Sequence, residues 1–238
     1  MIRKPNFKLN WKYALGEIAL IFIGISLAIA FQNWNDKRIE LREVKAYLDK
    51  ISTNVKADLE SLQELKTFRD STKMGCTQFV NLSRQATADS TEILSYFDDF
   101  GNHLAIYDVF FNSNRSGFEA LKGAGYLNKL QSTEVEAQLF SYYLQVDVIE
   151  DQEASLNAFV ESMETEMFKE NVVQQLIPLL ERRLSHKNDA KLAHELLKNP
   201  AFVGANIRLS QVNTMGILYD RILATGDSLL IAINNFNQ

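Results

Sequence analysis

Residues that interrupt helices, bridge chains or bind metals are scarce in this sequence. Its 238 residues include only 3 Pro and 10 Gly, which argues against an all-β or loop-rich chain. The single cysteine, Cys76, excludes an intrachain disulfide and a zinc site built on paired cysteines. Of the three histidines, His103, His186 and His194, none stands in a spacing that supplies a full ligand set. We therefore expect neither a metal nor another cofactor.

Catalytic motifs are also missing. The sequence has no P-loop, GxGxxG or GxSxG pattern. Gly123-Ala124-Gly125 matches only the start of a dinucleotide fingerprint and lacks its third glycine. Cys76 lies among apolar residues and is interpreted as a packed side chain. We therefore expect a protein that is not an enzyme, with a site in the aromatic segment 101–115 as the less favoured alternative.

One long apolar run stands near the N-terminus. Residues 14–31 contain a single charge, Glu17, and as a helix they would span about 27 Å, close to the hydrocarbon thickness of a bilayer. Trp11, Tyr13 and Trp34 flank the run, as interfacial aromatic anchors do. A buried core helix and a signal peptide cleaved after an A-x-A-like site at residues 28–30 are the alternatives. The run is longer than a usual signal core, so we expect a retained transmembrane helix over residues 13–34.

Three residues of this run share one helical face. At 100° per residue, Gly24 and Ala28 lie within about 20° of Glu17. Gly24 and Ala28 form a small-xxx-small pair that lets two helices approach closely, and a carboxylate in hydrocarbon is costly unless it has a role or reaches the interface. Glu17, Gly24 and Ala28 are thus predicted to form a helix contact face. The alternative is that Glu17 only snorkels to the interface.

The distribution of charge bears on location and partners. Residues 1–34 carry a net +3 and the whole chain −5, which leaves −8 on residues 35–238. Lys and Arg are equally frequent on both sides of the run, so the positive-inside rule gives no firm orientation. We expect residues 1–12 to be a basic cytoplasmic tail and residues 35–238 an extracytoplasmic domain of a single-pass inner-membrane protein. The acidic domain argues against binding nucleic acid.

The remaining sequence has the pattern of long helices. No Gly or Pro occurs in residues 25–74 or 126–177. Apolar residues recur at 3–4 spacing in both stretches, with Asp58 interrupting the first seam and Glu153 the second. We expect Asp58 to face water near a helix crossing, the alternative being a buried polar residue that sets helix register. The fold class is therefore all-α, a coiled-coil-like up-and-down bundle continuous with the membrane helix.

Several helix ends are also marked. Capping-box patterns at residues 116–119 and 133–136 predict two helix starts. Gly123 and Gly125 predict the end of the short helix that begins at the first of these. Asn199 followed by Pro200 predicts the start of a last helix that reaches about Phe236. The segment 101–115 is expected to be a loop or short elements that cover the bundle.

The chain resembles an uncharacterised family of bacterial single-pass membrane-anchored helical proteins. The resemblance rests on Gly16-Glu17-Ile18, Ile23-Gly24-Ile25, Asn33 to Arg38, Tyr47-Leu48, Asp58-Leu59, Phe118 to Leu127 and Leu139 to Tyr143. It covers most of the chain and implies a retained anchor, but it implies no activity. The chain departs from the family at Gly117-Phe118, where Thr-Tyr is expected, and at Tyr126, where Asn is expected.

These observations lead to one leading hypothesis about function. A helix suited to contact inside the membrane continues into long helices, and no catalytic constellation accompanies it. We therefore expect a membrane-tethered, extracytoplasmic interaction module with a sensory or scaffold role. Its partners would be the lipid bilayer and a membrane protein. A structural homo-oligomer built by self-association is the alternative.

Overall fold

The computed structural model describes residues 11–85, 89–98, 109–172, 174, 188–211 and 213–238. Within these ranges the chain is all-α, as predicted, and contains no strand. The elements are α1 (Trp11–Arg84), α2 (Ser90–Asp98), α4 (Ser116–Gly123), the 3₁₀ helix η1 (Tyr126–Leu130), α5 (Glu134–Lys169), α7 (Asn188–Leu196), α8 (Pro200–Ser210) and α9 (Asn213–Asn237).

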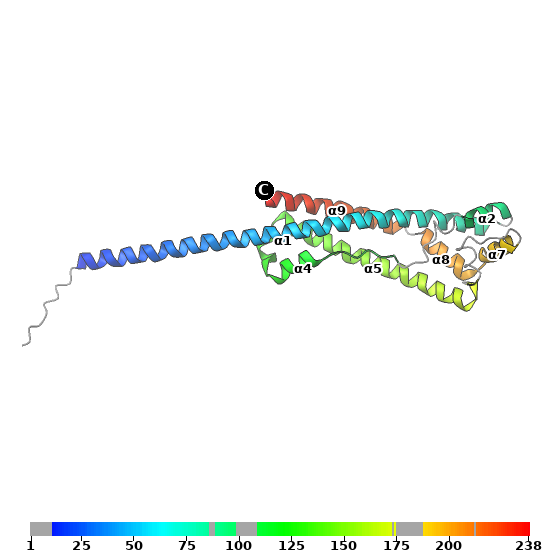
Figure 1. The fold of residues 1–238 in the computed structure, drawn as a ribbon, viewed down its shortest axis with the longest axis horizontal. Helices are drawn as coiled ribbons and strands as arrows, with labels where there is room; N and C mark the ends of the chain where they lie inside the picture. Colours follow the sequence, from blue (N-terminus) through cyan, green and yellow to red (C-terminus); the bar gives the residue numbers. More distant parts are fainter. Residues whose placement is uncertain (1–10, 86–88, 99–108, 173, 175–187, 212) are drawn as a thin grey trace, which may run out of the picture.

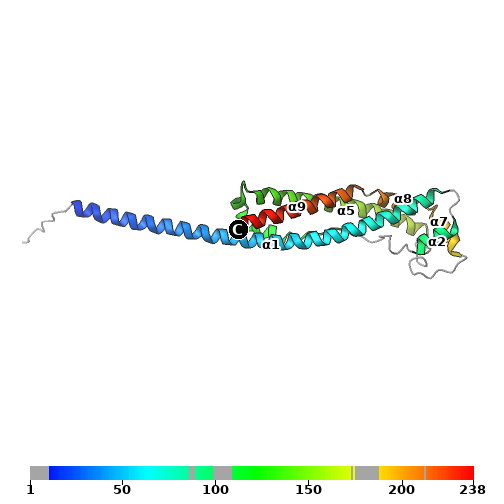
Figure 2. The same ribbon diagram turned by 90° about the horizontal axis from the view of Figure 1, so that it is seen from above.

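The longest element is α1, an unbroken helix of 74 residues. At 1.5 Å per residue its axis is about 110 Å long. Its N-terminal half extends alone, and its C-terminal half packs against the other helices (Figure 1; Figure 2). The first fully packed side chain is Val44, ten residues after Trp34. The helix therefore continues without a break across the predicted boundary between residues 34 and 35, and packing begins about ten residues later.

The bundle consists of α1, α5 and the pair α8–α9. Side-chain contacts join α1 to α5 at Asp58–Tyr142 and at Arg69–Glu153, with the same sequence offset of 84 at both places. A constant offset means that these two helices run parallel. In contrast, α9 runs antiparallel to α1, because Lys66 contacts Asp220 while Lys45 contacts Asn237. The C-terminal end thus returns to the part of α1 nearest the exposed helix (Figure 1).

The consecutive long helices α1 and α5 run parallel, whereas the expected up-and-down bundle has them antiparallel. After α2, residues 109–115 run back along the bundle in extended form and lead into α4 (Figure 1). Because this extended segment returns the chain, α5 can start at the same end as the packed part of α1. The segment contributes Phe111 to the core. Residues 101–108 of the expected covering segment lie outside the described residues.

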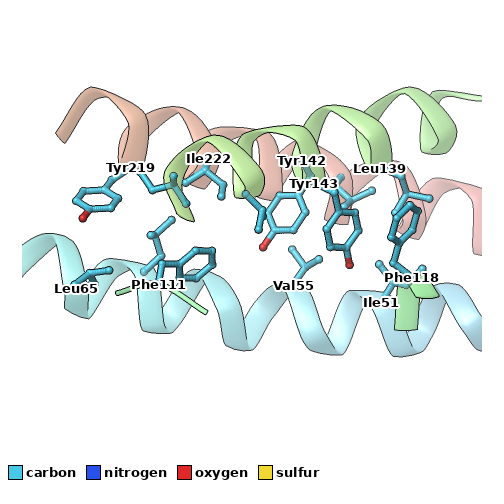
Figure 3. Close-up of a cluster of buried hydrophobic side chains, with 14 of the residues drawn as sticks. Ile51, Val55, Leu65, Phe111, Phe118, Leu139, Tyr142, Tyr143, Tyr219 and Ile222 are labelled. Carbon is cyan, nitrogen blue, oxygen red and sulfur yellow. The ribbon is translucent and has the colours of Figure 1, made fainter. Parts of the chain in front are cut away.

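Two apolar cores fill the bundle. The larger joins α1, α4, α5 and α9, and Figure 3 shows Phe111 and Phe118 lying between α1 and the helices opposite. The smaller lies at the far end, where Phe79 of α1 meets Tyr96 of α2 and Phe202 of α8. Cys76 is completely buried in the larger core, as expected of a packed side chain.

The predicted helix ends are confirmed in part. The Thr133 hydroxyl caps α5 by accepting the Glu136 amide, and Asn199 caps α8 with Pro200 in its first turn. Gly125 follows α4 with φ 75°, a conformation that glycine adopts without strain. The capping box predicted at Ser116 is wrong, because Arg115 holds the N-cap position and Ser116 is already helical.

The last helix was expected to be continuous from Pro200 to Phe236, and this is also wrong. The described residues form two helices, α8 and α9, with Gln211 in a turn after α8. No glycine or proline marks this break, and the apolar spacing continues across it. No helix-breaking residue in the sequence therefore separates the two helices.

Candidate functional site

The exposed half of α1 is the most unusual surface of the molecule. From residue 15 to Ile39 every side chain is exposed, although the segment includes the long apolar run. It is the one helix among the described residues that is long and apolar enough to cross a membrane, with a mean hydropathy of 2.0 over its best window. None of that window is buried against the rest of the chain. The core helix of a soluble protein is mostly buried, and this segment is not.

The aromatic residues at its two ends are exposed as well. Trp11 and Tyr13 precede the apolar segment, and Trp34 follows it. Trp34 packs beside Phe31, with ring centroids 5.8 Å apart, and the Arg38 guanidinium lies 5.7 Å from the centroid of the Trp34 ring. A cation over an indole at the end of an apolar helix suits the boundary between hydrocarbon and water.

Glu17, Gly24 and Ala28 lie on this exposed helix, as predicted from their spacing. All three are open to the surroundings, and a Cβ built on Gly24 would meet no atom within 4 Å. No element of the described chain covers their face. Their predicted role as a contact face between helices therefore stays a prediction, because it depends on a second molecule.

Inside the bundle, two acidic residues on the apolar seams form buried polar clusters. The first is Asp58 on α1, which is only 4% exposed. Its carboxylate accepts hydrogen bonds from the Ser113 hydroxyl at 2.6 Å, the Asn114 amide at 2.9 Å and the Tyr142 hydroxyl at 3.2 Å. The expectation that Asp58 faces water is therefore wrong. The extended segment 109–115 brings two donors that compensate for burying the charge.

The second cluster lies three turns further along. Arg69 of α1 donates to Glu153 of α5, and the Tyr219 hydroxyl of α9 donates to the same carboxylate. Arg69 also donates to the backbone carbonyl of Val109 at 2.5 Å. The side chains of Arg69 and Glu153 are 5% and 0% exposed. This ion pair, with Tyr219, joins the three long helices at one level.

Two neighbouring tyrosines at the first cluster point the same way. Tyr142 and Tyr143 extend from α5 with their hydroxyl groups toward α1 (Figure 3). Tyr143 stacks on Phe118 of α4, with ring centroids 4.4 Å apart. Large rings bridge the space between α1 and α5, which the extended segment and α4 also enter. The polar clusters therefore sit within a layer of aromatic packing.

Burial changes the acidity of the groups in this region. It raises the pKa of Glu153, and the neighbouring Arg69 guanidinium partly offsets the rise. Burial also raises the pKa of Cys76 to about 12, so the thiol is not a nucleophile at neutral pH. Breaking a buried ion pair by removing one partner costs about 3–5 kcal/mol. These clusters therefore join the long helices through buried polar contacts.

A third group of contacts ties the bundle to α1 near the exposed helix. Lys129 of η1 pairs with Glu40 at 2.7 Å, and the Tyr126 hydroxyl donates to Glu43. The latter hydrogen bond raises the pKa of Tyr126 to about 12. Beside the first pair, a hollow of about 290 Å³ is lined by Lys37, Glu40, Leu41, Val44, Lys129 and Phe236. This end of the bundle therefore combines lysine side chains with an apolar surface.

Other residues singled out from the sequence are not brought together. His103 and His186 lie outside the described residues, and His194 is on α7. In the part of the chain that the structure describes, no three His, Cys, Asp or Glu side chains are arranged to hold a metal ion. In the alternative enzyme site, the described residues 109–115 include Ser113 and Asn114, whose polar groups bond to Asp58.

The buried ion pair was the functional feature that sequence reasoning missed. Glu153 was recognised as an exception on its seam, but its partner Arg69 was not identified. The signal was present, because Asp58 and Arg69 are 11 residues apart on one helical face of α1. Tyr142 and Glu153 repeat the same spacing on α5, which is consistent with two parallel helices in register.

The comparisons with known proteins found no match, either among protein-family models, among curated proteins or among solved structures. The resemblance to a membrane-anchored bacterial family therefore stays a prediction.

Proposed function

We propose that this protein is a membrane-tethered interaction module of sensory or scaffold type, with its bundle outside the cytoplasm. The observation that carries the proposal is the exposed apolar half of α1, which continues without a break into the packed bundle. Burying that surface in lipid removes it from water, and the aromatic residues at its ends suit the two interfaces. The short basic segment at residues 1–12 is proposed to remain in the cytoplasm.

The partner is proposed to be a membrane protein that contacts the face of Glu17, Gly24 and Ala28. Nothing in the described chain covers this face, so a partner helix can approach it without rearranging the bundle. Small residues allow close packing between helices, and a carboxylate can find a hydrogen-bond donor on the neighbour. Self-association of two copies along this face is the alternative.

Gentle detergent extraction of the tagged full chain tests this proposal. Glu17→Leu and Gly24→Ile should each release the partner while the protein remains in the membrane fraction. Ala19→Ile is the matched control for Gly24→Ile, because it places the same side chain about 140° away on the helix. A Cβ added at Gly24 meets no other element of its own chain within 4 Å, so release of the partner by Gly24→Ile and not by Ala19→Ile points to contact with another molecule.

Two outcomes would change the conclusion. A complex of unchanged size in both variants would refute the contact face. A complex that contains only copies of this chain, by native mass, would replace the partner protein with the self-associating scaffold.

The orientation is tested by attaching a membrane-impermeant thiol reagent to Asn128→Cys in sealed vesicles of known sidedness. Labelling only from the cytoplasmic side would refute the proposed topology.

A further inference from the structure

The end of the bundle formed by α4, η1 and the C-terminal turn of α9 lies close to the exposed part of α1. Lys129 is bonded to Glu40, which follows Trp34 by six residues. In a helix this is about 9 Å along the axis, and Lys37 is only about 4.5 Å from Trp34. The structure thus places η1 less than two helical turns from the interfacial tryptophan.

The dimensions of a bilayer make this spacing informative. The polar head-group region is about 5–8 Å thick on each side of the hydrocarbon core. Transmembrane helices tilt by about 20° on average, and packed helix axes lie about 8–10 Å apart. A tilt toward the bundle would lower η1 by about 3 Å relative to α1. The remaining separation of about 6 Å falls within the head-group region.

The composition of this end also suits a lipid surface. Residues 120–133 and 228–238 contain no acidic side chain, although residues 35–238 carry a net −8. Their two lysines are Lys122, which pairs with Glu119 at 3.8 Å, and Lys129. The acidic groups Glu40 and Glu43 of α1 already have partners in Lys129 and Tyr126. Residues 123–128 are uncharged and combine three small residues with Tyr126, Leu127 and Asn128, a mixture that suits a region between water and hydrocarbon.

We propose that this end of the bundle, centred on residues 123–133, rests on the phospholipid head groups beside α1. This inference rests on the proposed membrane anchoring and adds a second contact with the bilayer. The hollow offers lipid phosphates the Lys37 ammonium beside the Lys129–Glu40 pair, next to an apolar surface of Leu41, Val44 and Phe236. The contact restricts the angle of α1 and holds the far end of the bundle away from the membrane.

Fluorescence quenching in vesicles tests the contact. The full chain is reconstituted into phosphatidylcholine–phosphatidylglycerol vesicles after an environment-sensitive dye is attached to Asn128→Cys. Thr91→Cys in α2 is the comparison at the far end, and Leu20→Cys reports on the apolar segment; all three native side chains are exposed. Cys76 is buried and does not compete for the dye, so one dye per chain also shows that the bundle is folded.

The expected result is loss of emission at residue 128 with a head-group nitroxide lipid and no loss at residue 91. Residue 20 should be quenched by an acyl-chain nitroxide lipid. Quenching at 20 without quenching at 128 would overturn the head-group contact alone. No quenching at 20 would overturn the membrane anchoring, and the contact with it.

A lengthened helix provides the matched control. Seven helix-forming residues inserted after Asn35 raise the bundle by about 10.5 Å and change its direction by only about 20°. This variant should lose the quenching at residue 128 and keep it at residue 20. Quenching at 128 that persists in the lengthened protein would overturn the proposal that α1 sets the contact.

Discussion

Removal of one partner of the buried ion pair should destabilise the bundle strongly. In Glu153→Leu the Arg69 guanidinium, 5% exposed, loses its counter-charge, and the Tyr219 hydroxyl loses its acceptor. An uncompensated buried charge costs about 3–5 kcal/mol. The orphaned hydroxyl adds about 1–3 kcal/mol. The free energy of unfolding of Glu153→Leu should therefore fall by at least about 3 kcal/mol.

The double variant should be far less damaged than the two single variants suggest. Arg69→Met alone leaves the Glu153 charge buried, whereas Arg69→Met with Glu153→Leu leaves no charge. The Val109 carbonyl then keeps the Asn157 amide as a donor, at 3.2 Å. The Tyr219 hydroxyl loses its acceptor, and the part-buried Asn157 side-chain oxygen loses a weak 3.4 Å donor, so the double variant should lose about 1–3 kcal/mol. The coupling energy between Arg69 and Glu153 should thus reach about 3 kcal/mol or more.

Unfolding of the full chain in detergent micelles with urea provides the measurement. Circular dichroism follows the loss of helix, and the reaction of Cys76 with a thiol reagent independently reports the opening of the core, because this thiol is fully buried. Adding Tyr219→Phe to the double variant is the control, since it removes the orphaned hydroxyl. Single-variant losses that add to within about 0.5 kcal/mol would refute the reasoning.

The pH dependence of Arg69→Met gives a separate test of the same pair. Burial raises the pKa of Glu153, and Arg69 partly opposes this rise. Without Arg69, the folded protein should favour the protonated carboxyl even more, while the unfolded chain ionises normally. Stability that depends on a raised carboxyl pKa is present at low pH and lost as pH rises. Arg69→Met should therefore lose more stability at pH 8 than at pH 5; a loss that does not change with pH would contradict this.

Three further predictions concern packing, burial and capping. Gly216→Ala has open space in α9 and should gain up to about 1 kcal/mol. Gly226→Ala should be less stable than Gly216→Ala by about 1 kcal/mol or more, because its new Cβ would lie 2.6 Å from a Leu59 methyl and that side chain must shift. Equal unfolding midpoints for the two variants would contradict this difference. Burial raises the pKa of Cys76 from 9.0 to about 12, so between these pH values the thiol ionises in the unfolded chain but not in the folded one. In urea titrations, wild type should therefore lose about 1.4 kcal/mol of stability per pH unit relative to Cys76→Ala. Thr133→Ala should cost about 1 kcal/mol in the same assay and Thr133→Ser much less, because the capping hydroxyl is retained.

The sequence predicted the kinds of element well because local signals determine them. The apolar run, the absence of Gly and Pro over residues 25–74 and the seven-residue spacing all indicated one long helix, and α1 is that helix. Thr133 and Asn199 marked true helix starts because their side chains bond to amides three residues away. Such signals act within one turn and can be read without knowing the rest of the fold.

The arrangement of the helices depended on distant contacts and could not be read in the same way. Asp58 was expected to face water, because an isolated carboxylate on an apolar seam is costly to bury. Its donors Ser113, Asn114 and Tyr142 come from segments that are 55 to 84 residues away. The extended return of residues 109–115, which supplies two of these donors, also makes α1 and α5 parallel. Neither feature has a local signature.

The unbroken path of α1 links the direction of its membrane face to the direction of the bundle. In an ideal helix, Val44, Ile51 and Leu62 lie about 160–180° around the axis from Glu17. The bundle therefore stands on the side of α1 opposite Glu17, Gly24 and Ala28. If two chains met along that face, their α1 helices would lie at the centre and their bundles would point away from each other. One residue inserted between Trp34 and Val44 would turn each bundle by about 100° about the axis of α1, so it would no longer lie opposite Glu17.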